Sequence, residues 1–225
     1  MSNKRIAVVL LSGGQDSVTS LFWTLKMFDE VHAVSFFYGQ KHEVELEMAR
    51  DICKDFNVKH TILNIAGTLS GSSLIDEGGD VNEPHSKNAS LPSSFVPARN
   101  ALFLTIAAGY AFNNSITDIV IGACQTDYSG YPDCRRVFID SMVCSLSLAM
   151  GVDFKIYTPL MYIDKAQTWE LADQLGVMDI IKQNTRTCYN GVQDELHSWG
   201  YGCSECPACK LRKKGYEEYT AKINN

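Results

Sequence analysis

The sequence lacks long hydrophobic runs, internal repeats and low-complexity tracts. Its longest uninterrupted aliphatic segment, Ile6 to Leu11, has six residues, whereas a membrane-spanning helix needs about 20. Lys4 and Arg5 precede this segment as in a signal peptide, but the segment is too short and ends in a Ser-Gly-Gly turn. We therefore predict a cytoplasmic protein that does not contact a membrane.

Basic residues are also in deficit, with 20 Lys and Arg against 26 Asp and Glu, which gives a net charge of −6. A general binder of polyanions carries the opposite sign, so we expect no direct nucleic-acid partner, although a local basic patch stays open. With 45% hydrophobic and 20% charged residues, the composition is globular and excludes wholesale disorder. We predict an α/β domain over residues 1–183 and an appended module over residues 184–225.

Apolar segments alternate with helical patterns along most of the chain. Strands are expected at residues 4–11, 31–38, 59–65, 116–123 and 154–157, and helices at 16–28, 42–56, 98–112, 135–150, 164–175 and from about 210. In the helix at 42–56, we expect Val44, Met48, Ile52 and Phe56 to share the buried face. The alternation predicts a doubly wound, mostly parallel, Rossmann-like sheet. Residues 67–97 show no sustained period and are interpreted as a lid, a binding loop or a disordered segment.

A glycine-rich turn joins the first strand to the first helix, with the sequence Ser12-Gly-Gly-Gln-Asp-Ser17. Glycines permit close approach of a ligand, and the free N–H groups of a helix N-terminus attract an anion. Asp16 can cap the helix or hold a magnesium ion on bound phosphates. The loop has neither a Walker nor a dinucleotide spacing. It resembles the PP-loop of ATP pyrophosphatases, and the alternative is a plain glycine-rich turn with a capping Asp.

Four of the eight cysteines cluster near the end of the chain. Cys203, Cys206 and Cys209 are separated by two-residue gaps, and fourteen residues separate Cys188 from this triplet. Four thiolates suit a closed, structural zinc site. An iron–sulfur cluster is the alternative, because a Cys-x2-Cys-x2-Cys run also begins the bacterial ferredoxin pattern.

Polar residues follow the expected fourth strand, at an edge of the sheet where α/β proteins bind ligands. Candidate substrate contacts here are Gln125, Asp127, Ser129, Tyr131, Asp133 and Arg135. The alternative is a turn in which Asp133 caps the following helix. Tyr38, Gln40 and His42 end the second strand, and His42 can equally be a helix-start residue. Arg99 opens a buried helix and suits an anion, whereas Lys165 either stabilises charge on phosphate or is solvated.

Taken together, these motifs resemble the QueC family over about residues 6–212. The resemblance rests on residues 12–17, on Tyr-Gly-Gln-Lys-His at 38–42 and on Phe-Val-Pro-Ala-Arg-Asn at 95–100. It rests equally on Ser-Gly-Tyr-Pro-Asp-Cys-Arg at 129–135, on Pro-Leu-Met-Tyr-Ile-Asp-Lys at 159–165, on Thr-Cys-Tyr-Asn-Gly at 187–191 and on the cysteine triplet. Three departures are Ala98 in place of Gly, Gln167 in place of Glu, and a long gap between Cys188 and Cys203.

The resemblance implies an adenine nucleotide alpha hydrolase-like fold and an ATP-dependent ligase of queuosine biosynthesis. Such an enzyme converts 7-carboxy-7-deazaguanine and ammonia to a nitrile through an adenylate and an amide, with ATP, Mg²⁺ and Zn²⁺, as a homodimer. The implied catalytic residues are Asp16, Arg99 and Lys165, and the implied ATP site is Leu10, Leu11, Ser12, Gly13, Gly14, Gln15, Asp16, Ser17, Val18 and Thr19. Alternatives are a tRNA-modifying PP-loop ligase or thiolase, another ammonia-dependent PP-loop synthetase, and a non-catalytic zinc-ribbon protein that binds nucleic acid.

Overall fold

A five-stranded parallel sheet forms the centre of the computed structural model, which describes residues 4–40, 43–76, 79–126 and 130–224. The strands are β1 (Ile6–Leu10), β2 (Glu30–Phe37), β3 (Lys59–Asn64), β6 (Asp118–Val120) and β7 (Lys155–Tyr157). Their order across the sheet is β3-β2-β1-β6-β7. The order of winding therefore reverses between β1 and β6, and in open α/β sheets ligands bind at such a point.

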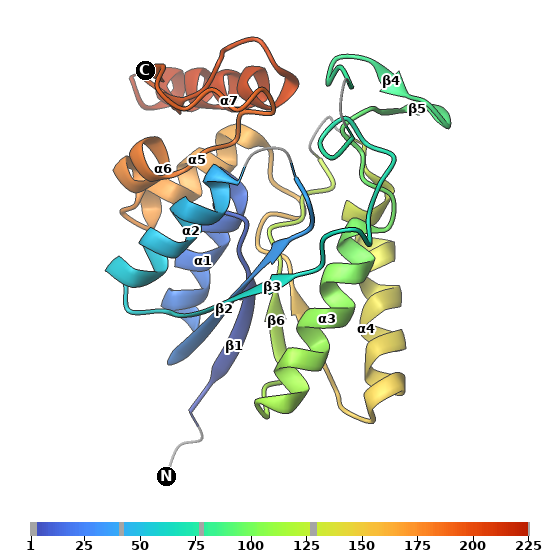
Figure 1. Ribbon diagram of the computed structural model, residues 1–225. Helices are drawn as coiled ribbons and strands as arrows, with labels where there is room; N and C mark the ends of the chain where they lie inside the picture. Colours follow the sequence, from blue (N-terminus) through green and yellow to red (C-terminus); the bar gives the residue numbers. More distant parts are fainter. Residues whose placement is uncertain (1–3, 41–42, 77–78, 127–129, 225) are drawn as a thin grey trace.

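Helices cover both faces of this sheet (Figure 1), as the sequence predicts. The covering helices are α1 (Gln15–Met27), α2 (Val44–Asp55), α3 (Arg99–Asn113), α4 (Arg136–Met150), α5 (Lys165–Gln174) and α6 (Met178–Asn184), and α7 (Pro207–Ile223) lies beyond the end of the sheet. Along β1, Ala7 and Val9 pack in the core on the side of α1, whereas Val8 and Leu10 pack on the side of α3 and α4. Because both faces of β1 are buried, its sequence is apolar without interruption.

The buried face of α2 differs from the predicted one. Leu46, Ala49, Ile52 and Cys53 are buried, whereas Phe56 is 44% exposed. With 3.6 residues per turn, a line of residues four apart drifts by about 40° at each step. The predicted stripe therefore turns away from the sheet before it reaches Phe56, and of its four members only Ile52 is fully buried.

The segment at residues 67–97 contains more structure than its sequence predicts. β4 (Pro84–His85) and β5 (Asn88–Pro92) form a short antiparallel hairpin there. Strands this short leave no periodic signal in the sequence. In Figure 1 this hairpin and α7 both lie above the end of the sheet at which its strands finish.

The C-terminal helix packs against α5. Trp169 Nε1 donates to the backbone oxygen of Arg212 at 3.1 Å, and Tyr219 OH donates to Asp173 Oδ2 at 2.7 Å. A Cβ atom on Gly215 would lie 2.7 Å from the side chain of Lys165, so only glycine permits this approach. α7 begins at Pro207 rather than near Lys210, because Cys206 caps it and proline suits the first helical position.

Three short elements near the C-terminus lack a sequence prediction, namely α6, β8 (Leu196–His197) and β9 (Gly200–Tyr201). The predicted boundary between residues 183 and 184 falls at the last residue of α6, and the division into two domains stays a prediction. Among the described residues, none of the helices combines the length and apolarity that a membrane crossing requires.

Candidate active site and metal centre

The loop between β1 and α1 is tightly folded against α2. Gly13 has a φ of +95°, and a Cβ atom there would lie within bonding distance of the backbone oxygen of Glu45, so no other residue fits. Ser17 Oγ accepts from the backbone N–H groups of Ser12 at 3.1 Å and Gly13 at 3.2 Å. The loop is thus held open toward the start of α1, where the first N–H groups lack helical partners and suit an anion.

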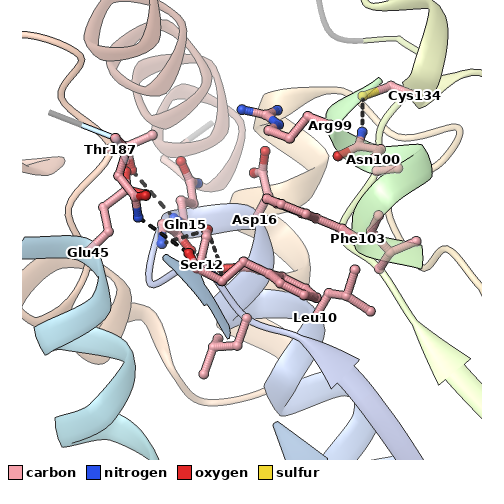
Figure 2. Close-up of a pocket in the computed structure, with 18 of the residues that line it drawn as sticks. Leu10, Ser12, Gln15, Asp16, Glu45, Arg99, Asn100, Phe103, Cys134 and Thr187 are labelled. Atoms are coloured by element: carbon pink, nitrogen blue, oxygen red, sulfur yellow. Dashed lines mark hydrogen bonds between the residues drawn. The ribbon is translucent and has the colours of Figure 1, made fainter. Parts of the chain in front are cut away.

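A pocket of about 260 Å³ lies over this loop, at the point where the strand order reverses (Figure 2). The predicted site residues that line it are Leu10, Leu11, Ser12, Gly14, Gln15, Asp16, Ser17, Tyr38, Gln40, Arg99 and Tyr131. Gly13, Val18 and Thr19 are not in its wall, and Val18 and Thr19 are fully buried on the core side of α1. His42, Asp127 and Ser129 lie outside the described residues. The structure therefore brings most of the predicted phosphate loop together with residues from β2 and α3.

Asp16 and Lys165 form an ion pair beside this pocket. Lys165 Nζ lies 2.8 Å from both carboxylate oxygens of Asp16 and is only 9% exposed, which rules out the solvated alternative. Lys165 is the first residue of α5, whose start is fixed by a capping box between Asp164 and Gln167. Gln167 supplies the backbone contact that a Glu would make, so this departure from the family pattern leaves the helix start intact.

Arg99 faces the pocket from the first turn of α3. Burial alone would lower its pKa, but the Tyr38 and Tyr131 phenols and Asp133 outweigh this effect and raise the pKa above its usual range. The guanidinium therefore stays charged and available for an anion. The preceding residue, Ala98, has a φ of +62°, a conformation that favours glycine, which is the residue expected there from the family pattern.

Three predicted substrate contacts lie outside the pocket wall. Asp133 Oδ2 accepts from the backbone N–H of Asn100, in the first turn of α3, at 3.1 Å. The N-cap position of α4 is occupied by Arg135 and not by Asp133. The alternative prediction that Asp133 caps the following helix is therefore wrong. The 3-10 turn at Pro132–Cys134 directs this buried side chain inward. Gln125 Oε1 accepts from Arg136 N at 2.8 Å, and Arg135 is exposed. Substrate contact by these three residues stays a prediction.

Among the residues of the pocket wall that sequence reasoning missed are Glu45, Thr187 and Tyr189. Thr187 and Tyr189 flank Cys188 within the motif at residues 187–191. This motif was recognised in the sequence, but only Cys188, as a metal ligand, was given a role. Glu45 lies in the first turn of α2 and has no signal in the sequence. Burial raises the pKa of its carboxyl to about 7, and the Cys188 charge adds to this effect while Arg99 opposes it.

The four clustered cysteines come together as predicted. One sulfur atom from each of Cys188, Cys203, Cys206 and Cys209 lies within 4.8 Å of the other three. Tetrahedral zinc with Zn–S bonds of about 2.3 Å places its sulfur atoms about 3.8 Å apart, so the four sulfur atoms would bind this ion after an inward movement of about 1 Å at most. Hydrogen bonds from Cys206 and Cys209 lower the pKa of Cys188, which shows how closely the thiols crowd one another. The other described cysteines, Cys53, Cys124, Cys134 and Cys144, do not belong to this cluster.

A parallel sheet with a glycine-rich loop at its reversal point defines an α/β fold of the nucleotide-binding type. The family model described as "Queuosine biosynthesis protein QueC" matches residues 6–220. The 7-cyano-7-deazaguanine synthase of Clostridium botulinum (strain Loch Maree / Type A3) is 51% identical over 219 residues, which cover 96% of this chain and 97% of that protein. The chain belongs to the QueC family, and the resemblance found in its motifs is confirmed.

Further similar proteins come from other organisms. The 7-cyano-7-deazaguanine synthase of Bacteroides fragilis is also 51% identical, over 220 residues that cover 97% of both chains. A solved structure, described as a predicted subunit of tRNA methyltransferase from Methanocaldococcus jannaschii, aligns with a TM-score of 0.46. It is 18% identical and covers 75% of this chain and 74% of its own.

Proposed function

We propose that this protein converts 7-carboxy-7-deazaguanine and ammonia to 7-cyano-7-deazaguanine at the expense of ATP, in queuosine biosynthesis. The observation that carries the proposal is the convergence, in one pocket of a QueC family chain, of a phosphate loop with the Arg99 guanidinium and the Lys165-paired Asp16. Similar proteins over nearly the full chain have the name of this synthase. We assign ATP to the loop at residues 10–19, and the deazaguanine to the side of the pocket with Tyr38, Gln40 and Tyr131.

The pocket residues fit an activation that proceeds by charge stabilisation. A carboxylate oxygen of the substrate attacks the α-phosphorus of ATP, and the bond to pyrophosphate breaks to leave an acyl adenylate. We propose that Lys165, Arg99 and the N–H groups at the start of α1 stabilise the negative charge of this step. Asp16 is part of the pocket wall, and its carboxylate oxygens would hold Mg²⁺. When bound, this ion would neutralise further negative charge on the phosphates.

Ammonia then attacks the acyl carbon, AMP leaves with the bonding electron pair, and one proton is released to give the amide. A second ATP activates the amide oxygen in the same way. Loss of the remaining nitrogen-bound protons forms the triple bond as the second AMP leaves. No side chain has to act as a nucleophile in this sequence. The zinc that the four thiols would hold has no open position and serves the structure alone.

A homodimer is the assembly we propose, with α4 as the contact surface. Val137, Ser141, Cys144 and Leu148 lie on one side of α4, and all four are exposed and uncharged. Val137 is 69% exposed and Leu148 is 80% exposed. Contact of these apolar side chains with water is unfavourable, which favours burial against a second copy of the chain. A thiol-ligated metal centre favours a reducing compartment, so we place the protein in the cytosol.

Mass spectrometry tests the proposed reaction on zinc-loaded protein with ATP, Mg²⁺, ammonium and 7-carboxy-7-deazaguanine. We expect the nitrile, together with AMP and pyrophosphate. In the Asp16→Ala variant, AMP release should fall by roughly 100-fold or more while zinc content stays unchanged. AMP without nitrile in the wild type would show a different substrate, and normal turnover of the variant would contradict the role of the loop.

A further inference from the structure

The Thr187 hydroxyl lies between the phosphate loop and the C-terminal helix α7. Its oxygen accepts from the backbone N–H of Gln15 at 3.4 Å, a contact drawn in Figure 2. The same oxygen accepts from Arg212 Nη1 at 3.0 Å. Arg212 belongs to α7, and Gln15 is the first residue of α1. One hydroxyl group thus joins the loop to a helix almost 200 positions further along the chain.

The number of hydrogen bonds that the Thr187 hydroxyl can accept and donate determines whether it can also bind a ligand. A threonine oxygen accepts two hydrogen bonds and donates one. Gln15 and Arg212 occupy both acceptor directions, and the described residues provide no acceptor for the Thr187 proton. Because Thr187 is part of the pocket wall, its O–H is left to donate to a bound molecule there.

Arg212 is built into the core in a way that fixes this orientation. It is 1% exposed, and it also donates from Nε to Trp199 O at 3.1 Å and from Nη2 to Ile181 O at 2.7 Å. Gly200, with a φ of +108°, leaves room for its guanidinium, which a Cβ atom would approach to 2.5 Å. Since this side chain cannot rotate without losing several contacts, the Thr187 oxygen keeps its acceptor role.

A second observation indicates that an anion binds at this end of the pocket. The Gln15 side chain is 1% exposed, and its Nε2 donor has no hydrogen-bond partner in the described part of the chain. Gln15 also belongs to the pocket wall, and Figure 2 shows it beside Thr187. A buried amide donor without a partner destabilises the folded protein unless a ligand supplies an acceptor. The Thr187 O–H and the Gln15 Nε2 group can therefore both donate to a ligand with several oxygen atoms.

We propose that the Thr187 hydroxyl donates a hydrogen bond to a phosphate oxygen in the pyrophosphate part of ATP, and that Arg212 is the positioning residue that orients it. This inference rests on the proposed function only for the identity of the nucleotide. It assigns to the segment next to Cys188 a role in binding phosphate as well as in binding the metal. The C-terminal helix thereby contributes to the ATP site without touching the nucleotide.

Isothermal titration of the zinc-loaded protein with inorganic pyrophosphate and, separately, with adenosine tests this inference. Thr187→Val removes the hydroxyl at constant shape, and Thr187→Ser retains it. A hydrogen bond to a charged group is worth about 1.5–3 kcal/mol, so the valine variant should bind pyrophosphate roughly 10- to 100-fold more weakly. Adenosine affinity should be unchanged in both variants, and the serine variant should bind pyrophosphate like the wild type.

The role of Arg212 is tested by a double-mutant cycle with Arg212→Lys. If Arg212 acts through Thr187, its replacement weakens pyrophosphate binding in the wild type but adds no further loss in the Thr187→Val background. Additive losses would overturn the positioning role. Equal pyrophosphate binding by the valine variant and the wild type would overturn the proposal, as would equal losses in the valine and serine variants or a parallel loss of adenosine binding. These titrations need no deazaguanine, so a wrong substrate assignment would leave their result intact.

Discussion

Glu45 places a carboxyl group in the pocket wall, where burial raises its pKa to about 7. Arg99 and Cys188 are the charged groups that act on it most strongly after burial. Between pH 4.5 and about 7, the folded protein holds a proton on this group that the unfolded chain releases. The associated stability is complete at low pH and is lost as the pH rises through about 7.

We therefore predict that Glu45→Gln raises the melting temperature clearly more at pH 8.5 than at pH 5.5, when the variant is compared with Glu47→Gln. Glu47 is exposed on the same helix and provides the matched control. Each kcal/mol of relieved burial cost should appear as about 2–4 °C in a chain of this size. Differential scanning fluorimetry at the two pH values measures this, and an equal effect at both would contradict a raised pKa.

Individual site residues were predictable from the sequence where they are contiguous. Ser12 to Ser17 form one motif whose chemistry is local, and the capping role of Asp164 follows from its position before a helical pattern. Glu45 and Thr187 become site residues only because the fold brings α2 and the metal-binding segment against the loop. The residues next to them in the sequence do not indicate that these segments contact the loop.

At the scale of elements, the start of α7 depends on the cysteine cluster. Cys206 Sγ accepts from Cys209 N at 3.5 Å and is also one of the four clustered sulfur atoms. We predict that Cys206→Ala loses zinc and lowers the melting temperature by roughly 10 °C or more, because structural zinc contributes several kcal/mol to folding. Glu205→Ala, at the exposed residue just before Cys206, is the control and should keep both properties. Metal analysis and calorimetry decide this, and a stable, metal-free variant would refute the structural role.

The prediction of elements succeeded where hydrophobic periods are long and failed where they are short. The five sheet strands and the helices α1, α3, α4 and α5 follow from extended apolar patterns. The β4–β5 hairpin and the pair β8–β9 are too short to produce a period, and α6 has only seven residues. Tertiary contacts, which the sequence pattern does not contain, determine these pieces.

At the scale of the whole molecule, the exposed side of α4 predicts association. Leu148→Glu should convert a dimer into a monomer, because it places a charge within the proposed apolar contact. Leu196→Glu introduces the same charge at another exposed leucine, in β8, and should leave the dimer intact. Light scattering coupled to size-exclusion chromatography distinguishes the two. A wild-type monomer, or a dimer that survives Leu148→Glu, would contradict the proposed surface.

The overall architecture also explains why one pocket can serve the complete proposed reaction. The chain leaves β1 and β6 toward opposite faces of the sheet at the reversal point, and α1, α3 and the metal-binding segment each bring side chains to the same opening. Both activations would then use the same phosphate loop, with the amide held in place between them. Two molecules of ATP should therefore be consumed for every nitrile formed.

The ratio of AMP to nitrile is the measurement that tests this account most directly. It is obtained by quantifying both products from one quenched reaction of the zinc-loaded protein with 7-carboxy-7-deazaguanine, ammonium, Mg²⁺ and ATP. The account predicts two AMP for each nitrile, with the amide appearing first and then declining. A ratio of one, or AMP formation that stops at the amide, would contradict a single site that performs both activations.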